Sequence, residues 1–157
     1  MQLRIIIIMI GQVTKSTLDR QVQLRLLDHD VRYTRGRRVV VAALSRAKGP
    51  LSASELSRMI GDVPLSSIYR TLAVLEEAGV VAHHLGAKGL TRFELAEWLT
   101  GHHHHLVCLD CGSVSDVEIP KSKEESVRRL VSEIAELASF DATEHALEIE
   151  GRCAQCA

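Results

Sequence analysis

Residues 52–79, SASELSRMIGDVPLSSIYRTLAVLEEAG, decide the fold of this chain. Ser52 and Glu55 have the spacing of a capping box, in which the serine and glutamate side chains bond the free amides at a helix start. The helix that they open is expected to be short and to end near Gly61. A second helix follows closely, so the stretch predicts two helices joined by a tight turn.

The second helix of this pair is expected to begin after Pro64, at Ser66 or Ser67, and to end at Gly79, which suits a left-handed backbone. In a helix-turn-helix, the second helix enters the major groove of DNA. Its buried face is expected to consist of Ile68, Leu72 and Leu75. The side chains left exposed are Ser66, Ser67, Tyr69, Arg70 and Thr71. Arginine can bond guanine in two places, while the hydroxyl side chains suit phosphates or thymine edges.

Further elements on both sides complete the order of a winged helix. Upstream, we expect a helix over residues 18–30 and a second helix that Thr34 caps and Gly49-Pro50 ends. Downstream, we expect a hairpin whose strands and turn are residues 80–85, 91–95 and 86–89. An arginine cluster near the second helix could meet DNA or could be an ordinary solvated face: Arg32, Arg35, Arg37 and Arg38.

The remainder of the chain predicts an α/β unit after a hinge. Its elements are strands over 106–108 and 114–119, a helix over 124–138 and a strand over 146–150. The fold class is therefore α+β. The predicted divisions are an N-terminal extension (1–17), a winged helix-turn-helix domain (18–96), a hinge (97–101) and a metal-binding domain (102–157).

Charge divides along the chain in the same way. From residue 15 to 92 there are 13 Lys and Arg against 7 Asp and Glu, a net charge of +6. From residue 93 to 157 there are 5 against 13, a net charge of −8. A basic first half and an acidic second half fit a DNA-binding unit followed by a cation-collecting unit, although two unrelated surfaces could also differ by chance.

The start of the chain and its cysteines bear on location. The apolar run Ile5–Ile10 is far shorter than the roughly 20 residues of a membrane span, and no small-residue cleavage site accompanies it. Without an export signal, paired cysteines favour metal over disulfides. We therefore expect a cytoplasmic protein with no membrane partner, whose residues 1–17 are a disordered extension.

Four cysteines form two C-x-x-C pairs, 41 residues apart: Cys108, Cys111, Cys153 and Cys156. Each pair supplies two thiolates on one turn, and two pairs complete a tetrahedral sulfur site. Gly112 frees the turn after the first pair. Four thiolates leave no open coordination position, so this pattern predicts structural Zn²⁺ rather than catalysis. The alternative is a redox-active dithiol, although such motifs rarely come as matched pairs.

The run His102–His105 enters the strand that carries the first cysteine pair. In an extended segment, alternate side chains point to opposite faces. His103 and His105 would then serve one metal site, and His102 and His104 another. Imidazole binds zinc, iron, nickel and manganese with less selectivity than thiolate does. The alternative is a solvated polar turn.

Several motifs in order give the chain a resemblance to the ferric uptake regulator family, from about Asp28 to the C-terminus. These motifs are Arg32-Tyr33-Thr34, Ser67–Leu72, Arg92-Phe93-Glu94-Leu95, His102–Gly112 and Glu148–Cys156. The family includes iron, zinc, manganese, nickel and peroxide sensors. The resemblance implies a homodimer, with residues 102–157 as its dimerisation domain, whose metal-loaded form binds a palindromic operator, usually as a repressor.

The resemblance also implies roles for individual residues. The four cysteines match structural zinc ligands. A sensor site between the domains is matched by His84, Glu94, His103 and His105. A further site inside the dimerisation half is matched by His102, His104 and His145, with Glu124 as its carboxylate. Tyr69 and Arg70 match recognition-helix residues and Arg32 a minor-groove residue; Arg37, Ser67 and Thr71 complete the predicted DNA-binding set.

Departures from the family pattern leave the sensed metal open. Pro50 stands where many members have a histidine ligand, and two extra residues before the histidines allow Glu97 to replace Glu94. Arg128 replaces the usual glutamate of the further site, which leaves Glu124 or Glu125. Asp116 stands at a position that peroxide-sensing members use, and Trp98 falls near the position of a cysteine in zinc-sensing members.

The sequence thus predicts a metal-dependent transcriptional regulator that is not an enzyme. Its cofactors would be structural Zn²⁺ and a second divalent metal, Fe²⁺ or Zn²⁺, with Mn²⁺ or Ni²⁺ as further candidates. The alternatives are a metal storage or chaperone protein and a peroxide-sensing regulator of the same fold. A zinc enzyme is disfavoured because the chain has neither a His-Glu-x-x-His segment nor a His-x-Glu paired with Pro-Cys-x-x-Cys.

Overall fold

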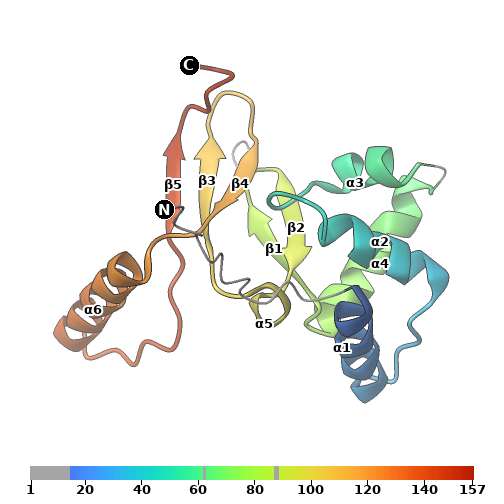
Figure 1. The fold of residues 1–157 in the computed structure, drawn as a ribbon, viewed down its shortest axis with the longest axis horizontal. Coiled ribbons are helices and arrows are strands. Elements are labelled where there is room, and N and C mark those ends of the chain that lie inside the picture. Colours follow the sequence, from blue (N-terminus) through green and yellow to red (C-terminus); the bar gives the residue numbers. More distant parts are fainter. Residues whose placement is uncertain (1–14, 62, 87–88) are drawn as a thin grey trace, which may run out of the picture.

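The computed structural model describes residues 15–61, 63–86 and 89–157, and shows two halves side by side (Figure 1). One half consists of four helices and a two-stranded hairpin, and the other of a short helix, a three-stranded sheet and one long helix. The hairpin lies between the helices and the sheet (Figure 1). This mixture of helices and separate small sheets confirms the α+β class.

The four N-terminal helices are α1 (Lys15–Asp28), α2 (Arg35–Leu44), α3 (Ala53–Ile60) and α4 (Leu65–Glu77). Thr34 caps α2 by accepting a bond from the amide of Arg37. The capping box of α3 is present in both directions. Gly79 follows α4 with φ of +65°, the left-handed conformation expected there. These local signals position the start of α2, both ends of α3 and the end of α4. Helix α2 ends at Leu44, five residues before the Gly49-Pro50 stop that the sequence predicts.

The start of α4 differs from the prediction. The helix begins at Leu65, with Pro64 as its N-cap, rather than at Ser66 or Ser67. No side chain caps this end. Proline is tolerated at a helix start because its missing N–H would have no intrahelical partner there.

The hairpin consists of β1 (Val81–Leu85) and β2 (Thr91–Leu95), paired antiparallel. Residues 87 and 88 of its predicted turn lie outside the described residues. Because directly paired residues share a face, Glu94 opposite Ala82 and Arg92 opposite His84 point to the same side. The other side packs into the core through Val81, Phe93 and Leu95. One face of the hairpin is thus left to meet the second half.

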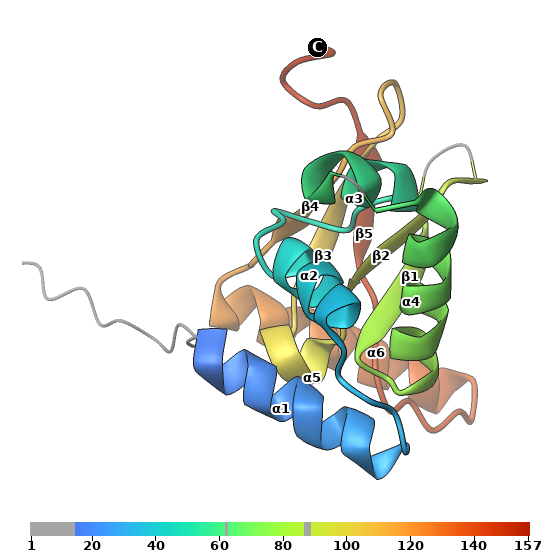
Figure 2. The same ribbon diagram turned by 90° about the vertical axis from the view of Figure 1, so that its right-hand side faces the viewer.

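The second half contains α5 (Glu97–Thr100), β3 (His104–Cys108), β4 (Val114–Val117), α6 (Lys121–Leu137) and β5 (Glu148–Gly151). The sheet order is β4-β3-β5, with β4 antiparallel and β5 parallel to β3. The segment predicted as a hinge contains the short helix α5, whose Trp98 donates to the carbonyl of Gly79 at 2.7 Å. Figure 2 shows α5 beside α1, in agreement with Arg25 of α1 lying 5.9 Å from the Trp98 ring.

Other boundaries shift by a few residues. Strand β3 starts two residues earlier than predicted, at His104, and α6 starts three residues earlier, at Lys121, after Pro120. Helix α1 includes residues 15–17, which were assigned to a disordered extension. Residues 1–14 of that extension lie outside the described residues. Among the described residues, no helix has the length and apolar character needed to cross a membrane.

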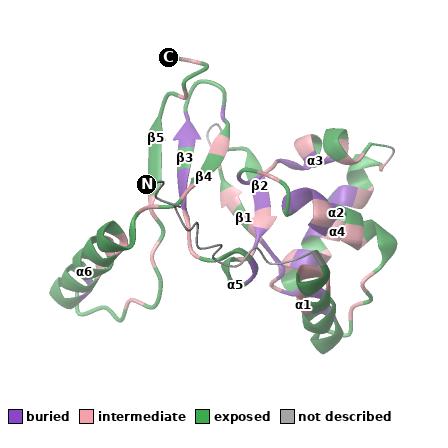
Figure 3. Ribbon diagram, viewed as in Figure 1, coloured by how far each residue is buried: buried purple, intermediate pink, exposed green. Residues whose placement is uncertain are grey.

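Burial is uneven between the halves (Figure 3). The large apolar core is built from α1–α4 and the hairpin, with Leu99 of α5 added. In the second half, burial concentrates on β3, whereas α6 is mostly exposed (Figure 3). The large apolar residues exposed there are Trp98, Leu106, Leu109, Leu130, Ile134, Leu137, Phe140 and Ile149. A helix with exposed apolar side chains is typical of a surface that another chain covers.

Candidate metal centres and nucleic-acid interface

The histidine run divides between two clusters on opposite sides of β3. His103 and His105 lie with Glu94 and Asp116, and the ligand atoms of these four residues are within 4.8 Å of one another. His102 and His104 lie with Glu124 and His145 under the same limit. The alternation expected of an extended strand therefore separates the two sets.

Glu94 joins the two halves of the molecule at the first cluster. Its Oε2 atom lies 3.0 Å from Nε2 of His103 and 3.3 Å from Nε2 of His105. Its other oxygen contacts Nε2 of His84, the diagonal neighbour of Glu94 on the hairpin face. Asp116 of β4 adds a second carboxylate, 3.8 Å from His103 and 3.7 Å from His105. Three predicted sensor residues, Glu94, His103 and His105, thus come together with Asp116, and His84 contacts this cluster through Glu94.

Glu94 and its neighbours His84 and His103 shift each other's pKa values in favour of their charged forms. Burial would raise the pKa of Glu94, but hydrogen bonds from His105, His84 and His103 hold it well below its usual range. The hydrogen bond to Glu94 raises the pKa of His84 despite burial. Burial lowers the pKa of His103, but its bonds to the Gly101 carbonyl and Glu94 raise it overall. A carboxylate surrounded by imidazoles is a site where protons and a cation compete.

The tautomer of His103 also suits a metal. Its Nδ1 lies 2.9 Å from the Gly101 carbonyl, to which it can only donate, so Nε2 is directed at the cluster. Such a bond to the second ring nitrogen orients metal-binding histidines. Ligand atoms about 2.1 Å from an ion lie roughly 3.0–3.5 Å apart, close to the separations of Glu94 from His103 and His105. The donor set fits a divalent cation.

Glu124 is the centre of the second cluster. Its Oε2 atom lies 2.8 Å from Nε2 of the buried His104, and its Oε1 lies 3.4 Å from His102 and 3.2 Å from His145. Among the described residues, the buried Nε2 atoms of His102 and His145 have no hydrogen-bond partner, as expected of atoms aimed at a shared cation. Arg128 lies 3.2 Å from the same Oε1 and balances its charge.

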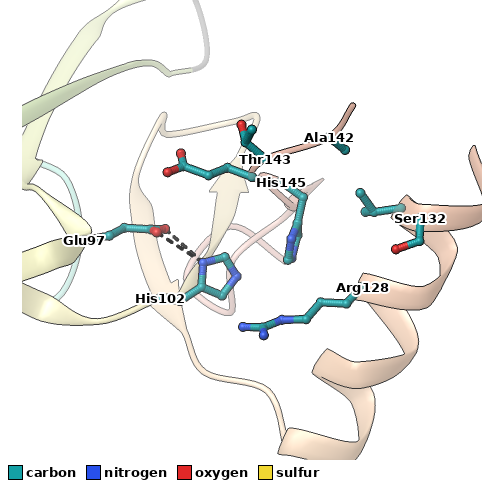
Figure 4. A pocket seen from close by; sticks show the side chains of 9 residues that line it. Glu97, His102, Arg128, Ser132, Ala142, Thr143 and His145 are labelled. Carbon is teal, nitrogen blue, oxygen red and sulfur yellow. Dashed lines mark hydrogen bonds and ion pairs between the residues drawn. The ribbon is translucent and has the colours of Figure 1, made fainter. Parts of the chain in front are cut away.

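Figure 4 shows the pocket beside this cluster, which has a volume of about 440 Å³. Glu97 enters it from α5 and contacts Nδ1 of His102 at 3.2 Å, while Arg128 and Ser132 line it from α6 (Figure 4). Glu97 therefore lies beside the second cluster, and Glu94 occupies the first. The short helix explains this difference, because it carries Glu97 away from the hairpin face that holds Glu94.

The four cysteines converge at the other end of β3. Parallel pairing of β3 with β5 sets Cys108 opposite Gly151 and so brings the two C-x-x-C turns together. All four sulfur atoms are within 4.8 Å of one another, and none is in a disulfide. Backbone amides of Cys111 and Cys153 lower the pKa of Cys108 to about 6. Amides that stabilise a thiolate, with three further sulfurs nearby, suit a tetrahedral Zn²⁺ site.

The exposed face of α4 carries the predicted DNA-reading residues. Ile68, Leu72 and Leu75 are buried, which leaves Tyr69 and Arg70 exposed, with Ser67 and Thr71 at the edges. The Arg70 guanidinium donates to Ser67 Oγ at 3.2 Å, on the same exposed face. Arg32 is exposed at the start of α2, and Arg37 donates to its carbonyl. The Arg37 side chain thus braces the turn before α2.

Sequence reasoning assigned no role to Arg92, which is buried and donates to carbonyls of both halves. In the sequence, Arg92 stands out only as the first residue of the Arg92–Leu95 motif. That motif does not reveal its contact with Gly112, 20 residues further along the chain. Asp116 is one of several carboxylates that the sequence offers as metal ligands, and the pairing of β4 with β3 sets it opposite His105. Both roles depend on contacts between segments that are distant in the sequence.

The comparisons with known proteins agree with this geometry. The sequence model of the ferric uptake regulator family matches residues 28–150. A ferric uptake regulation protein of Legionella pneumophila is 41% identical over 60% of this chain and 65% of its own length, so the chain spans just under two thirds of that relative. One of Brucella abortus is 35% identical over 76% of this chain and 82% of its length.

A solved structure extends the match to three dimensions. The crystal structure of the Vibrio cholerae ferric uptake regulator is 29% identical, with a TM-score of 0.69 over 83% of this chain and 98% of that one. Sequence, fold and order of motifs therefore agree over most of the chain. The protein belongs to the ferric uptake regulator family of metal-responsive transcriptional regulators.

Proposed function

We propose that this protein is a metal-dependent DNA-binding transcriptional regulator that acts as a repressor. The observation that carries the proposal is the position of Glu94. This residue comes from the hairpin of the helical half but lies against His103 and His105 of the sheet half. A cation held there binds both halves, so its presence favours one angle between them.

In this mechanism the chain's own residues do three things. The four cysteines hold Zn²⁺ and fix the end of the sheet. Glu94, His84, His103 and His105 bind the regulatory divalent cation, Fe²⁺ or Zn²⁺, with Mn²⁺ and Ni²⁺ as candidates. Arg70 and its neighbours on α4 then meet bases or phosphates in the major groove. His102, His104, Glu124 and His145 would hold a further cation that anchors α6 to the sheet.

The regulator is proposed to act as a homodimer on a palindromic operator in the cytoplasm. Leu130, Ile134 and Leu137 form one exposed stripe along α6, and Leu106 lies beside Ile149 on the sheet. A second copy of the chain would bury these side chains. A two-fold dimer presents two α4 helices to two half-sites, which explains an expected palindrome. A regulator of this kind needs no enzymatic step, and we infer none.

The test is binding of genomic DNA fragments by protein that is titrated separately with iron(II), zinc, manganese and nickel. We expect at least one metal to produce fragment-selective binding in the presence of excess random DNA. A protein that binds metal but retards no fragment would support metal storage instead. Arg70→Ala, which leaves the metal clusters intact, is the control that separates DNA contact from metal uptake.

A second candidate, a peroxide-sensing regulator, is favoured by one observation. Asp116 brings a second carboxylate to the first cluster, 3.7 and 3.8 Å from its histidines. Oxygen-rich donors suit iron(II) and manganese(II). The discriminating result is irreversible loss of operator binding when the iron-loaded protein meets hydrogen peroxide, with the manganese-loaded protein unaffected.

A further inference from the structure

Arg92 is a buried cation that connects the helical half to the cysteine knuckle, the turn of residues 108–112. Only 7% of its side chain is exposed. Its Nη1 donates to the Pro50 carbonyl at 3.0 Å and to Glu55 at 2.9 Å. Its Nη2 donates across the molecule to the carbonyl of Gly112, next to Cys111. One guanidinium therefore joins the start of α3 to the cysteine knuckle.

The contact with Glu55 links Arg92 to the helix-turn-helix. Oε2 of Glu55 also accepts bonds from the amide and hydroxyl of Ser52, at 2.8 and 2.7 Å, in the α3 capping box. Helix α3 in turn precedes and packs beside α4. A path from the cysteine knuckle to the DNA-reading helix thus passes through this arginine.

The turn at residues 48–50, whose Pro50 carbonyl accepts from Arg92, makes a second contact between the halves. The Lys48 carbonyl accepts a bond from the amide of Asp116 at 3.0 Å, so it occupies the outer edge of strand β4. Gly49 packs so closely that an added Cβ would lie 2.5 Å from the Val114 carbonyl oxygen and 2.8 Å from Cα of Ser115. Those neighbours are backbone atoms, which cannot move aside as a side chain would.

Asp116 connects these contacts to the first metal cluster. Its carboxylate lies beside His103 and His105, while its amide bonds to the turn of the helical half. We propose that Arg92 is a positioning residue which, with the turn at 48–50, forms a latch that docks the helical half on the cysteine knuckle and strand β4 without using the metal-binding side chain of any sensor residue. The sensor cation then tightens a contact that already exists. This inference rests on the proposed function for its consequence, but the latch itself can be measured without DNA.

The first measurement is hydrogen exchange of the Asp116 amide by NMR. The sample is the full-length protein that retains zinc at the cysteines and has been dialysed free of other metals. Exchange of this amide reports opening of the latch, because its acceptor belongs to the other half. We expect Arg92→Gln and Gly49→Ala each to raise its rate at least tenfold, while core amides such as that of Leu72 change less than twofold.

Two matched controls separate the latch from general effects of substitution. Arg152→Gln removes an arginine near the four cysteines that is 67% exposed and bonds Asp110. Gly36→Ala adds a methyl group where nothing lies within 4 Å. Both should leave the Asp116 rate within twofold of the wild type. The latch is refuted if both latch variants fold and keep the wild-type rate, or if the controls open Asp116 equally.

Arg92→Lys tests whether Arg92 positions the two halves or only stabilises the fold. Lysine keeps the charge beside Glu55 but lacks the planar fork that reaches two acceptors at once. We expect it to restore the melting temperature of Arg92→Gln but not the protection of Asp116. Equal restoration of both would show that Arg92 only stabilises the fold. If Arg92→Gln does not fold, Gly49→Ala decides the question alone, and an unchanged Asp116 rate in that variant overturns the latch.

The second measurement is DNA affinity with and without manganese(II) added to the dialysed protein. A latch that holds the halves without sensor metal predicts that Gly49→Ala loses at least fivefold more affinity in the metal-free state than in the loaded state. Equal losses in both states would contradict this consequence. If the wild type binds no DNA in either state, the proposed function fails, whereas the exchange result still decides whether the latch exists.

Discussion

Protons should compete with the sensor cation for the histidines of the first cluster, and the number of protons released sets how steeply metal affinity depends on pH. The pKa of His84 is raised above the ordinary 6.5 by Glu94, and that of His103 by the Gly101 carbonyl and Glu94. Each histidine must be neutral to bind a metal. Near and below pH 6.5, binding of one cation should therefore release at least these two protons. Each proton released changes the free energy of metal binding by about 1.4 kcal/mol per pH unit, so two protons change the metal affinity roughly 100-fold per pH unit.

The assay is metal affinity by competition with a chelator, from pH 5.5 to 7.5 at fixed ionic strength and with zinc retained at the cysteines. The logarithm of affinity should rise with pH at a slope of about 2 or more at the acid end and should flatten at the alkaline end. His84→Ala should lower the slope by about one, since one proton fewer is released. Operator binding at limiting metal should fall in parallel as pH drops.

The reasoning is refuted if metal affinity changes less than threefold between pH 5.5 and 6.5. It is also refuted if His84→Ala retains the wild-type slope, because the second proton would then come from elsewhere. Random-sequence DNA is the control for operator binding, since its phosphate contacts involve neither His84 nor His103. A pH response of equal size on random DNA would mean that the cluster is not the proton source.

Three further predictions concern other parts of the molecule. Cys108→Ser should release zinc and unfold or monomerise the protein, because the metal contributes folding energy directly; a zinc-free variant that still runs as a dimer in size-exclusion chromatography would contradict this. Arg70→Ala should weaken operator binding by roughly 1–3 kcal/mol and random DNA less, by fluorescence anisotropy, and equal losses would mean that Arg70 contacts only phosphate. The metal-free protein should have its highest melting temperature between about pH 4.5 and 6.5. The lowered pKa of Glu94 gives stability that is lost as pH falls below the ordinary 4.5. The raised pKa values of His84 and His103 give stability that is lost as pH rises past 6.5. A melting temperature that is flat from pH 4 to 8 would contradict the last prediction.

The sequence predicted those parts of the structure that depend on short-range chemistry. The capping box of Ser52 and Glu55 and the left-handed Gly79 are satisfied by neighbours within a few residues. The alternation of the histidines follows from strand geometry alone, so the two sets separated as expected. Local rules were enough in each case.

Contacts between distant segments could not be predicted in the same way. The choice of Glu94 over Glu97 depends on a four-residue helix that turns Glu97 toward His102. The role of Arg92 depends on how the two halves dock, which no periodicity encodes. The sequence left Glu124 and Glu125 as alternatives to the glutamate that Arg128 replaces, and it is Glu124 that joins the cluster, with Arg128 beside it as a charge partner.

The most direct test of the account is operator affinity with and without iron(II), under anaerobic conditions, for the wild type and Glu94→Gln. Zinc content is measured alongside, to keep the cysteine site equally loaded in both proteins. We predict that iron tightens wild-type binding by at least tenfold, within the 1–3 kcal/mol typical of coupled sites, and leaves Glu94→Gln unchanged. An equal response of the two proteins to iron would contradict the claim that a cation between Glu94 and the β3 histidines controls DNA binding.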